Sequence, residues 1–323
     1  MLFVGPSGVG KSSASVQQDI LWSVGRPAFG IFPARPMKIT TIQAENDDGD
    51  LTEMSRGIMD GLQLTLAERE QVSTNTFYIS EKVRTGPIFV RFIESVLKLF
   101  RPDLLRLDPL QSYLGGDTSD VAAISTFVHT GLNPLLKAYG CACIINHHTP
   151  KTINRDSTKW RNSDWQYAGA GSAVLTNWAR AILVVDPCDG NPRLFRFIAA
   201  KRGYRLGWKT ETGDPSIIRY FKHAQEDGVI FWTDAQPDEI ASGSKIQQNK
   251  ADVLALVPAD EPIFQNTLIS NAQIAGIGEK KARRFISELV VEKSLYVWRT
   301  PRPRTNPRID LARTPQPEPR LEV

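Results

Sequence analysis

The stretch GPSGVGKS, residues 5–12, matches the pattern G-x-x-x-x-G-K-[S/T] and decides the fold that we expect. Glycines let successive backbone N–H groups turn towards one anion, and a helix that follows directs its positive end at the same charge. The apolar run MLFV precedes the pattern, and SASVQQDILWSVG, with helical spacing, follows it. The sequence therefore predicts a phosphate-binding loop between a buried strand and a helix.

This loop predicts which residues hold the phosphates of a nucleotide. Lys11 would reach the β- and γ-phosphates, and the hydroxyl of Ser12 would bind Mg²⁺. The full set that we assign to the nucleotide is Gly5, Pro6, Ser7, Gly8, Val9, Gly10, Lys11, Ser12 and Ser13.

The rest of the chain alternates strand and helix patterns to about residue 186 and then shows a series of short strands. The alternation predicts an α/β fold with a mostly parallel, doubly wound sheet over residues 1–233. A polar stretch, 234–249, is typical of a linker. Three helix patterns and a β-ribbon at 250–313 predict a small winged-helix-like α+β domain, and the Pro-rich residues 314–323 predict a disordered tail.

Two carboxylates end predicted strands and suit a phosphate site. Asp108 ends the run LLRLD and would hold the shell of the Mg²⁺ ion. Arg106 within that run predicts a less central strand, because a strand buried on both faces rarely carries a guanidinium. Glu45 ends KITTIQAE, so it would lie at the carboxyl edge of the sheet and polarise an attacking water. Taken alone, Glu45 could equally be a solvated loop acid.

Six stretches of this sequence together resemble one family. GPSGVGKSS, QAEND, LDPLQSYLGGD, IINHHTPK, GAGSAVLTNWARAILVV and AAKRGYRLG are similar, in this order, to the RecA-like ATPases of the plasmid helicase RepA type, relatives of the DnaB-type replicative helicases. The resemblance covers about residues 1–232. It implies ATP and Mg²⁺ as ligands, a homo-hexameric ring and movement along single-stranded DNA. Because such proteins normally carry residues before this first strand, we expect a chain extended upstream of Met1 to be more stable and to assemble better.

The resemblance also implies roles for single residues. His148 matches a sensor histidine that ties the γ-phosphate to the following loop, and a neutral imidazole can donate one hydrogen bond and accept another. Arg180 matches an arginine that points at the nucleotide of the neighbouring subunit, and Lys201 with Arg202 resembles a second basic pair used in the same way. Alternatively, His148 is a polar strand end and the three cations form ordinary surface ion pairs.

A long polar segment, residues 151–171, is a candidate contact for single-stranded DNA. It interleaves basic and aromatic side chains, which would neutralise the DNA backbone and offer stacking surfaces. In RepA-like rings the loop at this place faces the central pore. The assigned residues are Lys151, Arg155, Lys159, Trp160 and Arg161, with Trp165 and Tyr167 as further aromatics. The alternative is a surface loop whose aromatics pack locally.

The predicted helix GEKKARRFISELVVEK carries basic residues in its first turns and apolar residues that would face the core. Such a helix can touch phosphates or base edges of duplex DNA. The assigned residues are Lys280, Lys281, Arg283 and Arg284, and the candidate wing adds Arg302 and Arg304. A winged helix can equally dock a protein such as a replication factor, so both kinds of partner stay open.

Composition limits the class of protein. With 323 residues and 41% hydrophobic content, the chain can bury a large core, and its formal net charge of +4 is too mild to require nucleic acid. We expect a cytoplasmic protein without a membrane partner, because no apolar run approaches the roughly 18 residues of a membrane span and no signal peptide precedes the loop. Cys141, Cys143 and Cys188 predict packed thiols rather than disulfides.

The sequence therefore predicts an ATP hydrolase, and more specifically a ring-forming replicative DNA helicase. Two alternatives stay open. One is a RecA-like ATPase that binds DNA without unwinding it, as a recombination mediator or regulator. The other is a DNA-binding regulator whose assembly is controlled by nucleotide and whose turnover is negligible.

Overall fold

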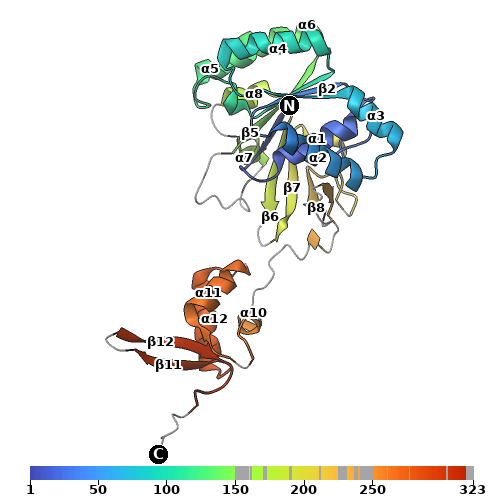
Figure 1. The fold of residues 1–323 in the computed structure, drawn as a ribbon. Coiled ribbons are helices and arrows are strands. Elements are labelled where there is room, and N and C mark those ends of the chain that lie inside the picture. The colour runs from blue at the N-terminus through green and yellow to red at the C-terminus, as the bar shows by residue number, and fades with distance from the viewer. Residues whose placement is uncertain are drawn as a thin grey trace, which may run out of the picture. The chain divides into compact units, whose positions relative to one another are not determined.

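The computed structural model consists of two compact units, Met1–Gly243 and Ser244–Val323 (Figure 1). The division falls inside the stretch that we expected to be a linker. The structure describes residues 1–149, 160, 162–169, 173–188, 191–210, 212–224, 231–235, 239–240, 250–259, 261–275, 277–302 and 305–317.

The first unit is built on a nine-stranded sheet with the order β3-β2-β4-β5-β1-β6-β7-β8-β9. The strands are β1 Leu2–Gly5, β2 Ile39–Gln43, β3 Thr76–Ser80, β4 Leu104–Asp108, β5 Ala142–His148, β6 Ile182–Cys188, β7 Asn191–Lys201, β8 Ile218–His223 and β9 Trp232–Asp234. The strands from β3 to β6 in this order pair in parallel, and β7, β8 and β9 extend the sheet with antiparallel pairs. The predicted α/β fold with a mostly parallel sheet is confirmed.

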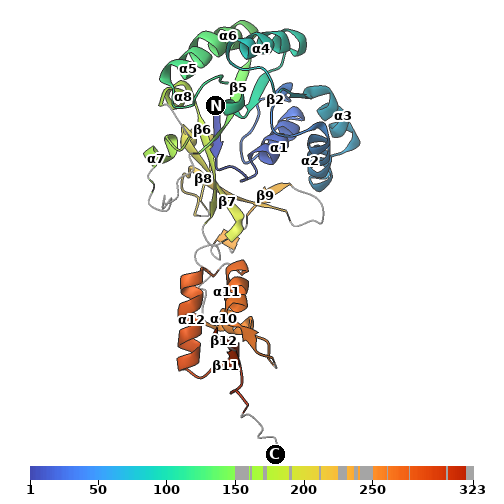
Figure 2. The same ribbon diagram turned by 60° about the vertical axis from the view of Figure 1, so that its left-hand side comes forward.

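Helices cover both faces of this sheet (Figures 1 and 2). They are α1 Lys11–Ser23, α2 Asp48–Gly61, α3 Leu66–Asn75, α4 Gly86–Phe100, α5 Val121–Ser125, α6 Asn133–Tyr139, α7 Asn162–Gln166 and α8 Ala173–Trp178, with short turns η1 Leu110–Ser112, η2 Thr126–Leu132 and η4 Gly203–Leu206. The π-helical turn η2 joins α5 directly to α6. Neither of the two short helices α7 and α8 was predicted; α7 lies in the segment 151–171, which was interpreted as a loop, and α8 follows that segment.

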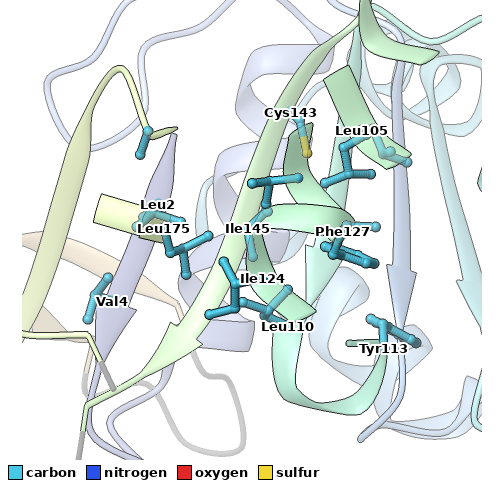
Figure 3. Close-up of a cluster of buried hydrophobic side chains, with 14 of the residues drawn as sticks. Leu2, Val4, Leu105, Leu110, Tyr113, Ile124, Phe127, Cys143, Ile145 and Leu175 are labelled. Atoms are coloured by element: carbon cyan, nitrogen blue, oxygen red, sulfur yellow. The ribbon is translucent and has the colours of Figure 1, made fainter. Parts of the chain in front are cut away.

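The central strand β1 is buried on both faces, which fixes the position of the loop that follows it. Leu2 and Val4 belong to the apolar cluster that β1 shares with α4, η2 and α8. Figure 3 shows this cluster, in which Leu2, Ile145 and Leu175 come from three different elements. Phe3 points to the other face and packs in a second cluster with α1. Alternation along a strand with two covered faces produces this pattern.

Arg106 corrects one prediction. β4 pairs with β2 on one side and with β5 on the other, so it is central, and the Arg106 side chain is fully buried. Its Nη2 lies 2.6 Å from Oδ1 of Asp19 in α1, and it also donates to Oε1 of Gln18 at 2.8 Å. A central strand tolerates this cation because a carboxylate and further hydrogen bonds compensate for its lost hydration.

The second unit has three helices and an antiparallel sheet with the order β10-β12-β11. The elements are α10 Lys250–Ala255, β10 Ile263–Phe264, α11 Gln265–Ile274, α12 Glu279–Val291, β11 Tyr296–Arg302 and β12 Thr305–Ala312. The helices and the ribbon agree with the sequence patterns, and β10 is an addition. An apolar cluster from the helices and the sheet, including Val253, Leu268, Phe285 and Leu311, holds this unit together. Its interpretation as a winged helix stays a prediction.

The start of the expected disordered tail is ordered against β11. The indole Nε1 of Trp298 donates to the carbonyl of Thr314 at 2.8 Å, and the amide of Arg299 donates to Oε1 of Gln316 at 3.0 Å. Thr314 and Gln316 are thus held against β11 by hydrogen bonds, although the Pro-rich composition of residues 314–323 predicted disorder. Residues 318–323 lie outside the described part of the chain.

Two further expectations concern the membrane and the thiols. None of the described helices is long and apolar enough to cross a membrane. Cys141 and Cys143 are buried and Cys188 is partly buried, and none of the three forms a disulfide, as predicted.

Candidate nucleotide site

The carboxyl ends of neighbouring parallel strands meet at one edge of the first unit's sheet. Gly5 of β1 lies opposite His148 of β5, and Gln43 of β2 lies opposite Asp108 of β4. A cavity of about 570 Å³ opens there, lined by the loop after β1, the segment after β2, and the ends of β4 and β5. Its volume is typical of a small-molecule site, and this edge is where open α/β sheets bind ligands.

Glycine conformation shapes the loop between β1 and α1. Gly8 and Gly10 have φ angles of +76° and +88°, which other residues adopt only with strain. Gly10 is the N-cap of α1, and no side chain caps the helix there. The first N–H groups of α1 therefore remain available for an anion, as the phosphate-loop pattern predicts.

The ammonium group of Lys11 is buried at the mouth of this loop. The residue is only 5% exposed, and its Nζ donates to the carbonyls of Gly5 at 3.0 Å and Pro6 at 2.7 Å. Burial lowers the pKa of Lys11 to about 8, although the charges of Asp108 and Glu45 oppose this shift. A polyphosphate would supply the close counter-charge that these neutral carbonyls do not.

His148 connects Lys11 with Glu45. Its Nδ1 lies 3.1 Å from Nζ of Lys11 and its Nε2 lies 3.6 Å from Oε1 of Glu45. An ammonium can only donate, so Nδ1 accepts and the neutral ring carries its proton on Nε2, facing Glu45. Burial and the charge of Lys11 lower the pKa of His148, while Glu45 raises it, which favours the neutral ring. The imidazole thus links the ammonium group of Lys11 in the phosphate loop with the carboxylate of Glu45.

The side chains of Ser12 and Asp108 fit a Mg²⁺ ion. Oγ of Ser12 donates to Oδ2 of Asp108 at 3.1 Å, which is close to the spacing of adjacent ligands in an octahedron with bonds of about 2.1 Å. Burial raises the pKa of Asp108, and the hydrogen bond from Ser12 and the charge of Arg106 oppose the rise. These two residues would hold the ion, which when bound neutralises charge on the β- and γ-phosphates.

Glu45 is placed by the turn that follows β2. The side chain of Gln43 closes this turn, since its Oε1 accepts from the amide of Asn46 at 2.8 Å and its Nε2 donates to the Asn46 carbonyl at 2.7 Å. A capping box between Asp47 and Asp50 then begins α2. Glu45 itself is 54% exposed and lines the cavity, so its carboxylate can reach a water there.

Two residues, Trp232 and His223, lie against the phosphate loop although the sequence reasoning did not single them out. Trp232 of β9 donates from Nε1 to Oγ of Ser13 at 3.0 Å, and its backbone exchanges hydrogen bonds of 2.8 and 2.7 Å with the side chain of Gln17. His223, the last residue of β8, lines the cavity beside them. They are more than two hundred residues from the loop in sequence, and no local pattern signals the contact.

The cations Arg180, Lys201 and Arg202 lie at the opposite edge of the sheet. Lys201 pairs with Ile182, the first residue of β6, which is next to the amino end of β1. The three cations line a separate cavity of about 650 Å³, and no acidic residue lines it in the described part of the chain. Lys201 also donates to the carbonyl of Thr176 at 2.8 Å near the end of α8. Within one chain these cations do not meet the phosphate loop, so their predicted role requires a neighbouring subunit.

The candidate DNA loop is described only in part. Lys151, Arg155, Lys159 and Arg161 lie outside the described residues. Trp160 is partly buried, and its ring lies 4.5 Å from that of Trp165, which is only 7% exposed. Trp165 therefore packs in the core and does not offer its face for stacking on bases. This agrees with the alternative interpretation, in which the aromatic residues of the loop pack locally. Tyr167 is exposed.

The basic residues of α12 contact their own helix. Arg283 pairs with Glu279 at 2.8 Å, and Arg284 lies 3.5 Å from Glu288. Lys281 and Arg284 also lie over the ring of Phe285, and Lys280 is exposed. Glu279 and Glu288 would compete with DNA phosphates for the guanidinium groups of Arg283 and Arg284. Contact of this helix with DNA stays a prediction. The side chains of Arg302 and Arg304 lie outside the described part.

A family model and a solved structure match parts of this chain. Residues 1–154 match a family model described as an AAA domain, and this range contains the phosphate loop, Glu45, Asp108 and His148. The first unit has a mostly parallel α/β sheet with the phosphate-loop pattern after its first strand. Among solved structures, this fold is similar to the crystal structure of the RadB recombinase, with 13% identity and a TM-score of 0.45 over 73% of this chain and 91% of that chain. No curated protein matches this chain.

Proposed function

We propose that this chain hydrolyses ATP with Mg²⁺ in the cavity at the carboxyl edge of its sheet. The observation that carries the proposal is that Lys11, Ser12, Asp108, His148 and Glu45 meet there. Lys11 and Ser12 would bind the triphosphate, and Asp108 with Ser12 would hold the ion. Glu45 would orient the attacking water, and His148 would link it to the γ-phosphate end.

We further propose that the protein works as a ring on single-stranded DNA, as a helicase of the RepA type. Support comes from the cluster of Arg180, Lys201 and Arg202. Among the described residues no acid lines its cavity, and the cluster lies away from the chain's own phosphate loop. A cation supplied by a neighbour would stabilise charge at the γ-phosphate and make hydrolysis depend on assembly.

The direct test measures ATP turnover by the full chain with and without single-stranded DNA. We expect turnover that requires Mg²⁺, rises severalfold with DNA and is lost in Lys11→Ala, because that variant lacks the cation at the phosphates. A strand-displacement assay on a forked duplex then separates two classes. Turnover stimulated by DNA without displaced strand indicates the non-unwinding ATPase, and nucleotide binding without turnover indicates the regulator.

A mixing experiment tests the role of Arg180 between subunits. Arg180→Ala and Glu45→Gln should each be nearly inactive alone. In an equal mixture, about a quarter of the interfaces would combine an intact Glu45 with an intact Arg180 from the neighbour, so turnover should exceed that of either variant. Absence of recovery at every mixing ratio would count against a shared site.

A further inference from the structure

His223 lines the nucleotide cavity but has no part in the proposed hydrolysis. Its Nε2 is buried and has no hydrogen-bond partner among the residues that the structure describes. A buried polar atom without a partner costs free energy, and in native proteins such an atom usually meets a ligand or a water. Burial also lowers the pKa of His223, so the ring is neutral near pH 7 and does not add charge to the cavity.

Tertiary contacts hold this imidazole against the phosphate loop. Its ring centroid lies 4.2 Å from that of Trp232, at an interplanar angle of 74°, and 4.9 Å from that of Phe195. Gly10 makes the approach possible, because a Cβ at that position would lie 2.8 Å from the Trp232 ring and 3.2 Å from Nε2 of His223. The hydrogen bonds from Trp232 to α1 described above keep the ring in this place.

The shape of the cavity indicates what His223 faces. Lys11, Ser12 and Asp108 mark its phosphate and metal end. Besides Glu45, Asn46 and His148, the other lining residues are Asp50, Glu53 and Met54 of α2, and His223. We therefore expect a nucleotide with its phosphates in the loop to place its nucleoside along the lining formed by α2 and His223.

We propose that His223 is a positioning residue that contacts the nucleoside of the bound nucleotide. A polar atom of the nucleoside supplies the partner that Nε2 lacks, and the contact holds the α-phosphate side of the ligand over the start of α1. This inference rests on the proposed nucleotide site and deepens it. It makes the antiparallel extension of the sheet part of the ligand site, although the P-loop pattern is confined to the first strand and helix.

The test compares ATP with inorganic tripolyphosphate, which has the phosphates but no nucleoside. Binding of both ligands is measured by isothermal titration calorimetry on the full chain. His223→Leu, which keeps apolar volume beside Trp232, should weaken ATP binding about fivefold and leave tripolyphosphate binding unchanged. His223→Gln, which keeps a polar group near the position of Nε2, should retain most of the affinity for ATP. Ser95→Leu, at an exposed position of α4 that lines neither cavity, serves as the control.

The other outcomes each overturn the proposal. Equal weakening of both ligands by His223→Leu would show that the residue acts through the phosphate loop. Unchanged ATP affinity would show that no contact exists. If the unaltered protein binds tripolyphosphate and ATP equally well, the nucleoside is not held, although the phosphate site stands. If it binds neither ligand, the proposed function itself fails.

Discussion

Glu45→Gln should lower ATP turnover by about a hundredfold or more while ATP still binds. The amide keeps the size of the side chain but cannot accept a proton from the attacking water. It also removes the charge that faces Nε2 of His148 at 3.6 Å. Because Lys11, Ser12 and the glycines of the loop are unchanged, the affinity for ATP should stay within about threefold. Steady-state turnover and equilibrium binding of a fluorescent ATP analogue measure the two quantities separately.

Glu94→Gln is the matched control, because Glu94 is an exposed acid on α4, away from the cavity. It should retain full turnover. Turnover of Glu45→Gln within about threefold of the unaltered protein would mean that Glu45 is the solvated loop acid of the alternative interpretation. Loss of ATP binding together with turnover would instead place Glu45 in the binding of the ligand.

Arg106→Leu should destabilise the first unit by about 3–5 kcal/mol, since it leaves the carboxylate of Asp19 buried without its cation. Asp19 also accepts a hydrogen bond from Thr41 at 2.7 Å, which cannot replace the charge of Arg106. The double variant Asp19→Leu/Arg106→Leu should recover at least about 1 kcal/mol of this loss, because no uncompensated charge remains. Urea unfolding of the full chain, followed by circular dichroism, measures the difference.

Arg35→Leu provides the control at the surface. Arg35 pairs with Asp103 at 2.6 Å, but its side chain is 66% exposed, so water replaces the lost partner. Its effect on the free energy of unfolding should be much smaller than that of Arg106→Leu. Equal effects of the two substitutions, or a double variant no more stable than Arg106→Leu, would contradict the view that the buried pair is tolerated only as a pair.

Local patterns predicted much of the first unit and of its site. The phosphate loop, the strand before it and the helix after it could be recognised because their chemistry lies within 23 consecutive residues. The capping box at the start of α3 is equally local, because its members Thr65 and Glu68 are three residues apart. The sequence places Glu45, Asp108 and His148 at the ends of predicted strands. Because parallel strands of an α/β sheet bring their carboxyl ends together, these residues could be predicted to lie at one edge of the sheet.

Tertiary structure decided the partners of these residues. The prediction that the strand of Arg106 is less central was wrong, because nothing near Arg106 in the sequence indicates its partner Asp19, which is 87 residues away. Trp165 suggested a surface for bases because composition does not distinguish an aromatic in a loop from one packed in the core. The contact of His223 with the loop at Gly10 requires β8 and β9 to join the sheet beside β7. The sequence by itself determined which groups can bind phosphate and metal, since these lie in short patterns. Only the fold decided which distant side chains pair with these groups or pack against them. Burial and pairing depend on contacts between elements that are far apart in the chain.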